Sequence, residues 1–181
     1  MNPVARILLV ASNLWFLSEG LLGPLVAVFA GRVGGDILDI SWAWALFLIV
    51  SGVSMIYVGR ISDKQFSKEK LMIVGYALYT LGSFAYIWVS SPLQLFIVEA
   101  ILGLATALAG PTWYSLFAKY ETKASSGKEW GLVTGQGKIA TAAAMMVGGF
   151  IVTYYSFIHL FIVMGVVQGV ATIYLLKILK K

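Results

Sequence analysis

The sequence predicts an all-α polytopic membrane protein with six transmembrane helices, and three observations support this prediction. Of its 181 residues, 60% are hydrophobic and only 12% are charged, about half the charged share of a soluble domain. Six apolar stretches are each long enough to span a bilayer. Basic residues gather between alternate stretches. We therefore expect residues 1–181 to form a single six-helix transmembrane domain with both termini in the cytoplasm.

The six apolar stretches are predicted to be helices because none alternates polar and apolar residues with period two, and because a helix satisfies its own backbone in lipid. Each is close to or above the ~20 residues that cross ~30 Å of hydrocarbon. In chain order they are Ile7–Ala30, Ile40–Val58, Leu71–Val89, Pro92–Phe117, Trp130–Tyr154 and Phe157–Leu176. Aromatic residues at their ends, such as Trp42, Trp88 and Tyr154, suit the headgroup level of a bilayer.

The first stretch follows Arg6 and has some features of a signal peptide. It is long enough to span the bilayer and holds Glu19, so we expect a transmembrane helix instead. Gly23-Pro24 lies inside this stretch and Gly110-Pro111 inside the fourth. Such pairs can bend a helix or free its backbone groups.

Small residues recur every four positions in the last two stretches, at Ala140, Ala144 and Gly148 and then at Gly165 and Gly169. This spacing lets helix backbones approach closely, which drives packing in lipid. A chain with 19 glycines also produces such spacing by chance, so the pattern leaves the contacting helices open.

The distribution of Lys and Arg predicts the orientation. Eleven of the 13 basic residues fall in the two terminal segments and in the second and fourth connections, whereas Arg32 falls on the other side and Lys138 within a span. Cytoplasmic segments carry such an excess, so we expect both termini on the cytoplasmic side of the cell (inner) membrane. The eleven are Arg6, Arg60, Lys64, Lys68, Lys70, Lys119, Lys123, Lys128, Lys177, Lys180 and Lys181.

Three ionisable residues lie inside the expected spans: Glu19, Glu99 and Lys138. A charge at a helix centre costs about 2.5–3.5 kcal/mol on insertion scales, so such residues face a cavity or a partner and are functional candidates. A glutamate that changes partners between conformations can take up and release a proton. The alternatives are a static buried pair, or a side chain that extends to the interface.

Two glutamines, Gln136 and Gln168, are further candidates for a polar pathway, together with Asn13, Ser18 and Thr141. Their alternative role is to tie helices together. The segment Glu19-Gly20-Leu21-Leu22-Gly23 is also echoed by Glu99-Ala100-Ile101-Leu102-Gly103. An inverted repeat of three plus three helices would place these two segments in equivalent positions.

Several other classes of function are disfavoured. The chain has no Cys and one His, so we expect no metal site and no cofactor. Neither Gly127-Lys128 nor Gly137-Lys138 completes a phosphate-binding loop, and no hydrolase or metalloprotease motif occurs. We therefore predict no enzyme. The excess of positive charge lies at helix ends rather than in a patch for nucleic acid.

The charged segment Gly59–Lys70 resembles the loop between the second and third helices of major facilitator superfamily transporters. Gly59, Ile61, Ser62, Asp63 and Lys64 match the family pattern, whereas Ser67-Lys68-Glu69-Lys70 departs from it. The segments Ala109–Ala118 and Glu129–Gly131 also look like this superfamily. The basic residue that many members carry in the fourth helix is absent, and so is the Gly-Pro pair common in the fifth helix of antiporters. Both departures weaken the resemblance to drug/proton antiporters.

The resemblance implies that this chain is one six-helix half of a transporter that has two halves, with a small-molecule substrate between them. It also implies that Asp63, with Gly59 and Lys64, acts as a conformational latch at neighbouring helix ends. A lone half would expose its pathway face to the bilayer, so we expect a homodimer or a second six-helix half.

The leading functional prediction is a secondary active transporter of a small solute, with proton coupling as one route. The first alternative is a non-transporting membrane interaction protein. The second is a truncated N-terminal half of a twelve-helix transporter. The sequence identifies neither the substrate nor the direction of transport.

Overall fold

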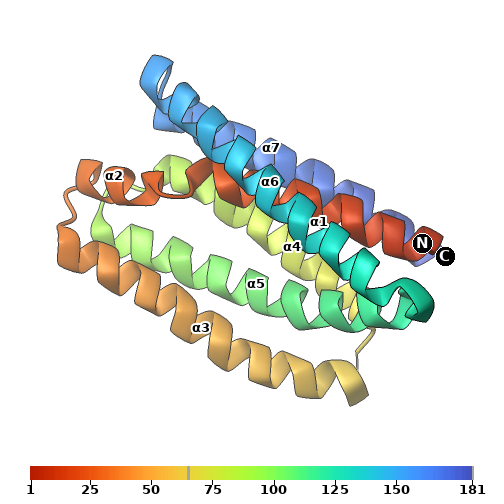
Figure 1. Ribbon diagram of the computed structural model, residues 1–181. Coiled ribbons are helices and arrows are strands. Elements are labelled where there is room, and N and C mark those ends of the chain that lie inside the picture. The colour runs from red at the N-terminus through yellow and green to blue at the C-terminus, as the bar shows by residue number, and fades with distance from the viewer. Residues whose placement is uncertain (65, 181) are drawn as a thin grey trace.

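The computed structural model describes residues 1–64 and 66–180, except for the side chain of Lys64, and is helical throughout apart from short connections (Figure 1). The helices are α1 (Pro3–Leu22), α2 (Leu25–Arg32), α3 (Ile37–Lys64), α4 (Lys68–Ala85), α5 (Pro92–Tyr120), α6 (Ser126–Tyr154) and α7 (Phe157–Leu175). Short 3-10 turns occupy Tyr86–Trp88, Lys123–Ser125 and Leu176–Lys180. Six of the described helices are long and apolar enough to cross a membrane, which confirms the predicted fold class.

Polar side chains start three of these helices. Asn2 accepts a hydrogen bond from the backbone N–H of Val4, Ser67 caps α4, and Ser91 caps α5 just before Pro92. Such caps satisfy backbone donors that have no partner within the helix. They place the helix starts at the ends of the apolar stretches.

The predicted stretch Ile7–Ala30 forms two helices, and the break falls at Gly23-Pro24, where the sequence suggested a bend. The helix α1 ends at Leu22, and α2 begins at Leu25 after Gly23 and Pro24. Gly23 adopts a positive φ of 33°, a backbone conformation that favours glycine. In contrast, α5 continues without interruption through Pro111.

The charged segment Gly59–Lys70 was predicted to be the loop between two helices, but most of its described residues are helical. Its first residues complete α3 as far as Lys64, and its last residues begin α4 at Lys68. Gln65 lies outside the described residues. The charged connection between the second and third spans is therefore very short.

The helices pack in a pattern that repeats between the two halves of the chain (Figure 1). In one set of contacts, α3 and α4 both pack against α5. In the other set, α6 and α7 both pack against α1. The helices α4 and α7 also pack on each other. If α1, α3 and α4 are exchanged for α5, α6 and α7 in that order, each contact is replaced by another contact of the same pattern. That is the arrangement expected of a three-plus-three inverted repeat.

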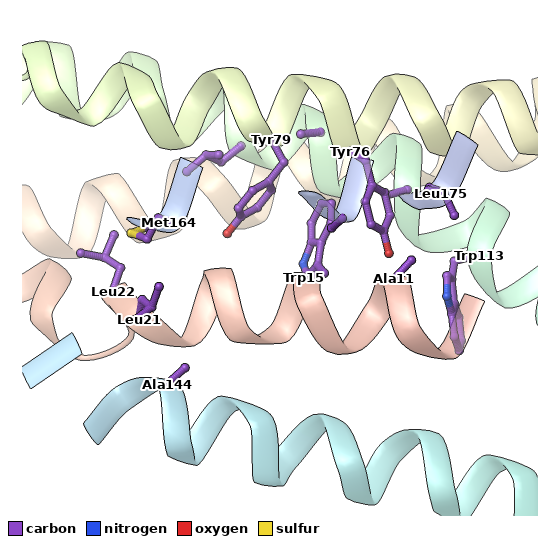
Figure 2. Close-up of a cluster of buried hydrophobic side chains, with 14 of the residues drawn as sticks. Ala11, Trp15, Leu21, Leu22, Tyr76, Tyr79, Trp113, Ala144, Met164 and Leu175 are labelled. Carbon is purple, nitrogen blue, oxygen red and sulfur yellow. The ribbon is translucent and has the colours of Figure 1, made fainter. Parts of the chain in front are cut away.

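Small residues make the closest contacts between α1 and α6. A Cβ added at Gly148 would collide with the backbone oxygen of Leu21, and one at Gly20 would lie 2.9 Å from the backbone oxygen of Thr141 and 3.0 Å from the Cβ of Ala144. Figure 2 shows Ala144 directly below α1. The four-residue spacing therefore marks a real helix contact, because only small side chains fit there.

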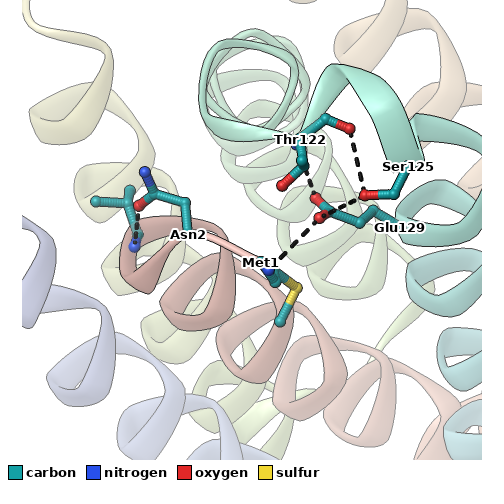
Figure 3. A network of polar contacts seen from close by, with 6 residues as sticks. Met1, Asn2, Thr122, Ser125 and Glu129 are labelled. Carbon is teal, nitrogen blue, oxygen red and sulfur yellow. Dashed lines mark hydrogen bonds and ion pairs between the residues drawn. The ribbon is translucent and has the colours of Figure 1, made fainter.

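Both chain termini lie at one end of the bundle, which we call the N/C end (Figure 1). Glu129, at the start of α6, fixes the connection from α5 at this end (Figure 3). Its carboxylate accepts hydrogen bonds from the backbone N–H of Thr122 at 3.2 Å and the hydroxyl of Ser125 at 3.4 Å, and it lies 3.7 Å from the amino group of Met1. These contacts hold α1, α5 and α6 together where they converge.

Candidate functional site

A cavity of about 220 Å³ opens between α1, α5 and α6, and α3 and α4 complete its wall. It reaches from the beginning of α6 and the end of α5, near the N/C end, to Glu19 far along α1. Cavities between helices of a bundle are common ligand sites. This volume is below the roughly 300–1,000 Å³ of pockets that enclose drug-sized ligands.

Aromatic side chains form most of the cavity wall. Trp15 on α1 packs against Tyr76 on α4 with ring centroids 4.7 Å apart, and Figure 2 shows both rings between α1 and α4. On the other side, Trp130 stands edge-on to Trp113 at 6.2 Å and stacked on Tyr114 at 6.3 Å. The lining aromatic residues are Trp15, Phe16, Tyr76, Trp113, Tyr114 and Trp130.

Glu19 is the one charged residue among the described residues that line the cavity. It lies one helical turn from Trp15, so both side chains project from the same face of α1. The break at Gly23-Pro24 follows directly after that turn. Of the five predicted pathway residues, Glu19 is the one that the structure places on the cavity wall.

Lys138 projects from α6, and its side chain is exposed. Within the described chain it makes no ion pair with Glu19 or Glu99 inside 4.0 Å, although its positive charge acts on Glu19 through space. It lies one turn beyond Thr134, which lines the cavity. Lys138 therefore lies on the same face of α6 as Thr134, but one helical turn beyond the residues that line the cavity.

Glu99 is buried away from the cavity, with 4% of its surface exposed. Its carboxylate accepts a hydrogen bond of 2.6 Å from the hydroxyl of Tyr86. Phe29 of α2 and Phe161 of α7 pack on the Tyr86 ring, with centroids 5.9 Å and 5.0 Å away. The side chain of Glu99 does not extend to the membrane interface. Instead it forms a buried pair enclosed by aromatic rings at the end of the bundle opposite the N/C end.

We expect Tyr86→Phe to lower the free energy of unfolding by about 1–3 kcal/mol, because it leaves the buried carboxylate of Glu99 without its donor. Adding Glu99→Met should recover part of this loss, since both polar groups are then gone. Denaturant-induced unfolding, followed by circular dichroism in detergent, measures both changes. The control is Tyr154→Phe at an exposed tyrosine. Equal stability of Tyr86→Phe and the unchanged protein would contradict a structural role for this pair.

The two predicted glutamines lie in the helix contacts rather than on the cavity wall. Gln136 on α6 accepts a hydrogen bond of 3.0 Å from the amide of Asn13 on α1. Gln168 on α7 is fully buried, and neither of its amide atoms has a hydrogen-bond partner among the described residues. Nearby, Ser18 donates a hydrogen bond to the backbone oxygen of Met164. The hydrogen bonds of Asn13 with Gln136 and of Ser18 with Met164 therefore tie α1 to α6 and to α7.

The predicted latch residues lie at the N/C end. Asp63 forms an ion pair of 2.8 Å with Lys68, and Lys68 donates a hydrogen bond of 2.7 Å to Ser115 on α5. A Cβ added at Gly59 would meet no described atom within 4 Å, so the close helix approach expected there does not occur within these six helices. The side chain of Lys64 lies outside the described residues.

Comparison with known families identifies the architecture. The sequence profile of the Major Facilitator Superfamily matches residues 8–181. The chain belongs to the Major Facilitator Superfamily. Its six long helices and their repeat are consistent with one half of a superfamily member.

Curated relatives in the Major Facilitator Superfamily differ in length. An uncharacterized MFS-type transporter of Methanocaldococcus jannaschii is 25% identical over 77% of this chain and 36% of its own length. Multidrug resistance protein MdtG of Klebsiella pneumoniae is 23% identical over 86% of this chain and 39% of its own length. The uncharacterized MFS-type transporter YitZ of Bacillus subtilis is 22% identical, and 98% of its length is covered. The chain thus spans well under half the length of two of these relatives.

The cavity of this superfamily member also contains functional candidates that the sequence prediction missed. Trp113, Tyr114 and Trp130 line it beside Glu19. Trp15 and Trp113 lie well inside their spans, too deep for the headgroup level that tryptophan prefers. The depth of these two tryptophans was the one sign in the sequence that they line a site. The cavity itself could not be predicted, because it forms only when α1, α5 and α6 come together.

Proposed function

We propose that this chain is one half of a secondary active transporter that moves a small solute across the membrane in exchange for, or together with, protons. The observation that supports this function most strongly is the placement of Glu19, a single carboxylate on the wall of an open cavity inside a membrane bundle. A carboxylate exposed to water in one conformation and buried in another can bind and release a proton. Membership of a transporter superfamily supports the same proposal.

We further propose that a second six-helix unit covers the cavity face, either a second copy of this chain or a separate half. Lys138 is exposed on the middle of α6, and a lysine facing lipid at that depth costs about 2.5–3.5 kcal/mol. A covering unit would remove that cost by giving Lys138 a polar environment. The cavity of about 220 Å³ is smaller than most pockets that enclose a ligand. This agrees with a binding site of which this chain supplies one part and a second unit the rest.

Reconstitution of the purified chain into proteoliposomes, with a panel of labelled solutes, tests the transport function. We expect flux of at least one solute, and native mass spectrometry from lipid should show a species with two units. A second copy would give a homodimer, whereas a separate half would appear only after co-expression of the neighbouring reading frame. Transport by a strictly monomeric chain would exclude the covering unit.

The competing proposal is a non-transporting membrane interaction protein, or a truncated N-terminal half of a twelve-helix transporter. Coverage of 36–39% of two relatives supports the second possibility. An interaction protein predicts a stable partner and no flux in any reconstitution. A truncated half predicts flux only when the remaining helices are supplied.

The proposed orientation places the N/C end in the cytoplasm of the cell (inner) membrane. The excess of Lys and Arg at that end supports it. Because the chain has no Cys, a single cysteine can be introduced at Ser67 and another at Ser90. A membrane-impermeant thiol reagent should label only the second in intact cells, and the reverse would invert the topology.

We also propose that Asp63 latches the N/C end against the covering unit. The Asp63 side chain is 69% exposed despite its ion pair with Lys68, so it remains accessible to a partner. Exposed ion pairs contribute only about 0–1 kcal/mol. Asp63→Asn should therefore leave the unfolding free energy nearly unchanged and yet slow solute exchange several-fold in proteoliposomes. The matched control is Asp36→Asn at the opposite end; equal exchange rates in both variants would reject the latch.

A further inference from the structure

We propose that the cavity between α1, α5 and α6 binds a small organic cation that carries an apolar or aromatic group. This inference names the substrate class for the proposed function and rests on it, but it concerns binding and can be tested without transport. It depends on three properties of the cavity: its charge, its aromatic faces and the state of its hydrogen-bond donors.

The charge of the cavity wall is negative. Glu19 is its one charged lining residue in the described chain, and Lys138, the nearby basic residue, lies outside the lining. A carboxylate inside a membrane bundle is costly unless it has a polar or cationic partner. A cationic ligand in the cavity would supply that partner.

The aromatic faces of the wall are available to such a ligand. The cation–π contacts of the described chain fall on Phe157, Tyr120 and Tyr174. None of these rings lines the cavity. No basic side chain among the described residues therefore lies over the rings of Trp15, Trp113, Tyr114 or Trp130. Trp and Tyr faces attract organic cations by about 0.5–2 kcal/mol each, which is the basis of aromatic cages for quaternary ammonium groups.

Five of the eight side chains of the wall that can donate a hydrogen bond already do so within the protein, and only Trp15, Tyr76 and Tyr114 have no such bond among the described residues. Few donors are therefore left for an anion or a sugar. The hydroxyls of Ser12, Thr106 and Thr134 donate to backbone oxygens one helical turn earlier. The indole N–H of Trp113 donates to the backbone oxygen of Leu8, and that of Trp130 donates to Glu121. An anion needs free donors, whereas a cation with an apolar body needs only the carboxylate and the rings.

Equilibrium dialysis of the full chain in lipid nanodiscs tests the inference with a pair of labelled probes, phenyltrimethylammonium and benzenesulfonate. We expect measurable binding of the cation and none of the anion. Glu19→Gln should weaken cation binding by about tenfold or more. Tyr114→Leu should weaken it roughly two- to tenfold through loss of a ring face. The matched control is Tyr57→Leu, an exposed tyrosine on α3 outside the cavity, which should leave the affinity unchanged.

Three outcomes would overturn the inference: no binding of the cation, equal binding of both probes, or an affinity that Glu19→Gln does not change. Circular dichroism of each variant establishes that it is folded. Failure of the transport proposal would look different. In that case the cation would bind with the expected dependence on Glu19 and Tyr114, but proteoliposomes would show no flux of it.

Discussion

Glu19→Gln should abolish proton-driven accumulation of the transported solute while leaving exchange of that solute across the membrane intact. A pH difference of one unit is worth about 1.4 kcal/mol and can support a roughly tenfold concentration ratio at one proton per solute. Glutamine cannot release a proton, so the ratio should fall to about one. Proteoliposomes with an imposed pH gradient, loaded with the solute identified by the panel, measure this ratio.

Solute exchange without a gradient, measured at saturating solute, separates coupling from binding in this experiment. The variant should still exchange, because the cavity and its rings remain. The matched control is Glu69→Gln, which removes a carboxylate near the start of α4 and outside the cavity and should keep the full ratio. A Glu19→Gln variant that still accumulates solute tenfold would exclude Glu19 as the coupling residue.

Gly148→Ala should destabilise the fold by at least about 1–3 kcal/mol, the usual cost of overpacking a well-packed contact. The added Cβ would collide with the backbone oxygen of Leu21, so α6 must move away from α1. A rigid backbone atom cannot rotate out of the way as a side chain can. The expected result is a lower unfolding midpoint in detergent, measured by circular dichroism against temperature.

Gly149→Ala is the control for this prediction, because a Cβ at that neighbouring position meets no described atom within 4 Å. Alanine favours a helix over glycine by about 1 kcal/mol, so this variant should be as stable as the unchanged protein or more so. Equal unfolding midpoints for the two variants would show that the contact of Gly148 with α1 does not contribute to stability. The comparison also locates the contact on one face of α6.

The number and order of the helices could be predicted from the sequence because each span satisfies its backbone alone and carries its own apolar signal. Ends defined by caps, such as Ser91 before Pro92, were close to the prediction. The break at Gly23-Pro24 was suspected, but a similar pair at Gly110-Pro111 leaves α5 unbroken. The local sequences are alike, so the packing around each helix must decide between them.

The candidate site was harder to predict because it depends on contacts between distant segments. The sequence marks both Glu19 and Glu99 as candidates, since both are acids inside spans and both begin a similar five-residue segment. The structure separates them: Glu19 borders the cavity, whereas Tyr86 and two phenylalanines enclose Glu99. Only the fold brings Tyr86, from the end of the third span, to the carboxylate of Glu99.

The position of the tryptophans gives this protein an internal optical reporter. Trp15, Trp113 and Trp130 surround the cavity. The other three of its six tryptophans, Trp42, Trp44 and Trp88, are exposed on the outside of the bundle. A ligand that enters the cavity would quench or shift the emission of the first group and leave the second group as a reference within the same molecule. The emission spectrum of the unlabelled chain would then record occupancy directly, and replacing the exposed group with phenylalanine would leave an emission that arises from the cavity alone.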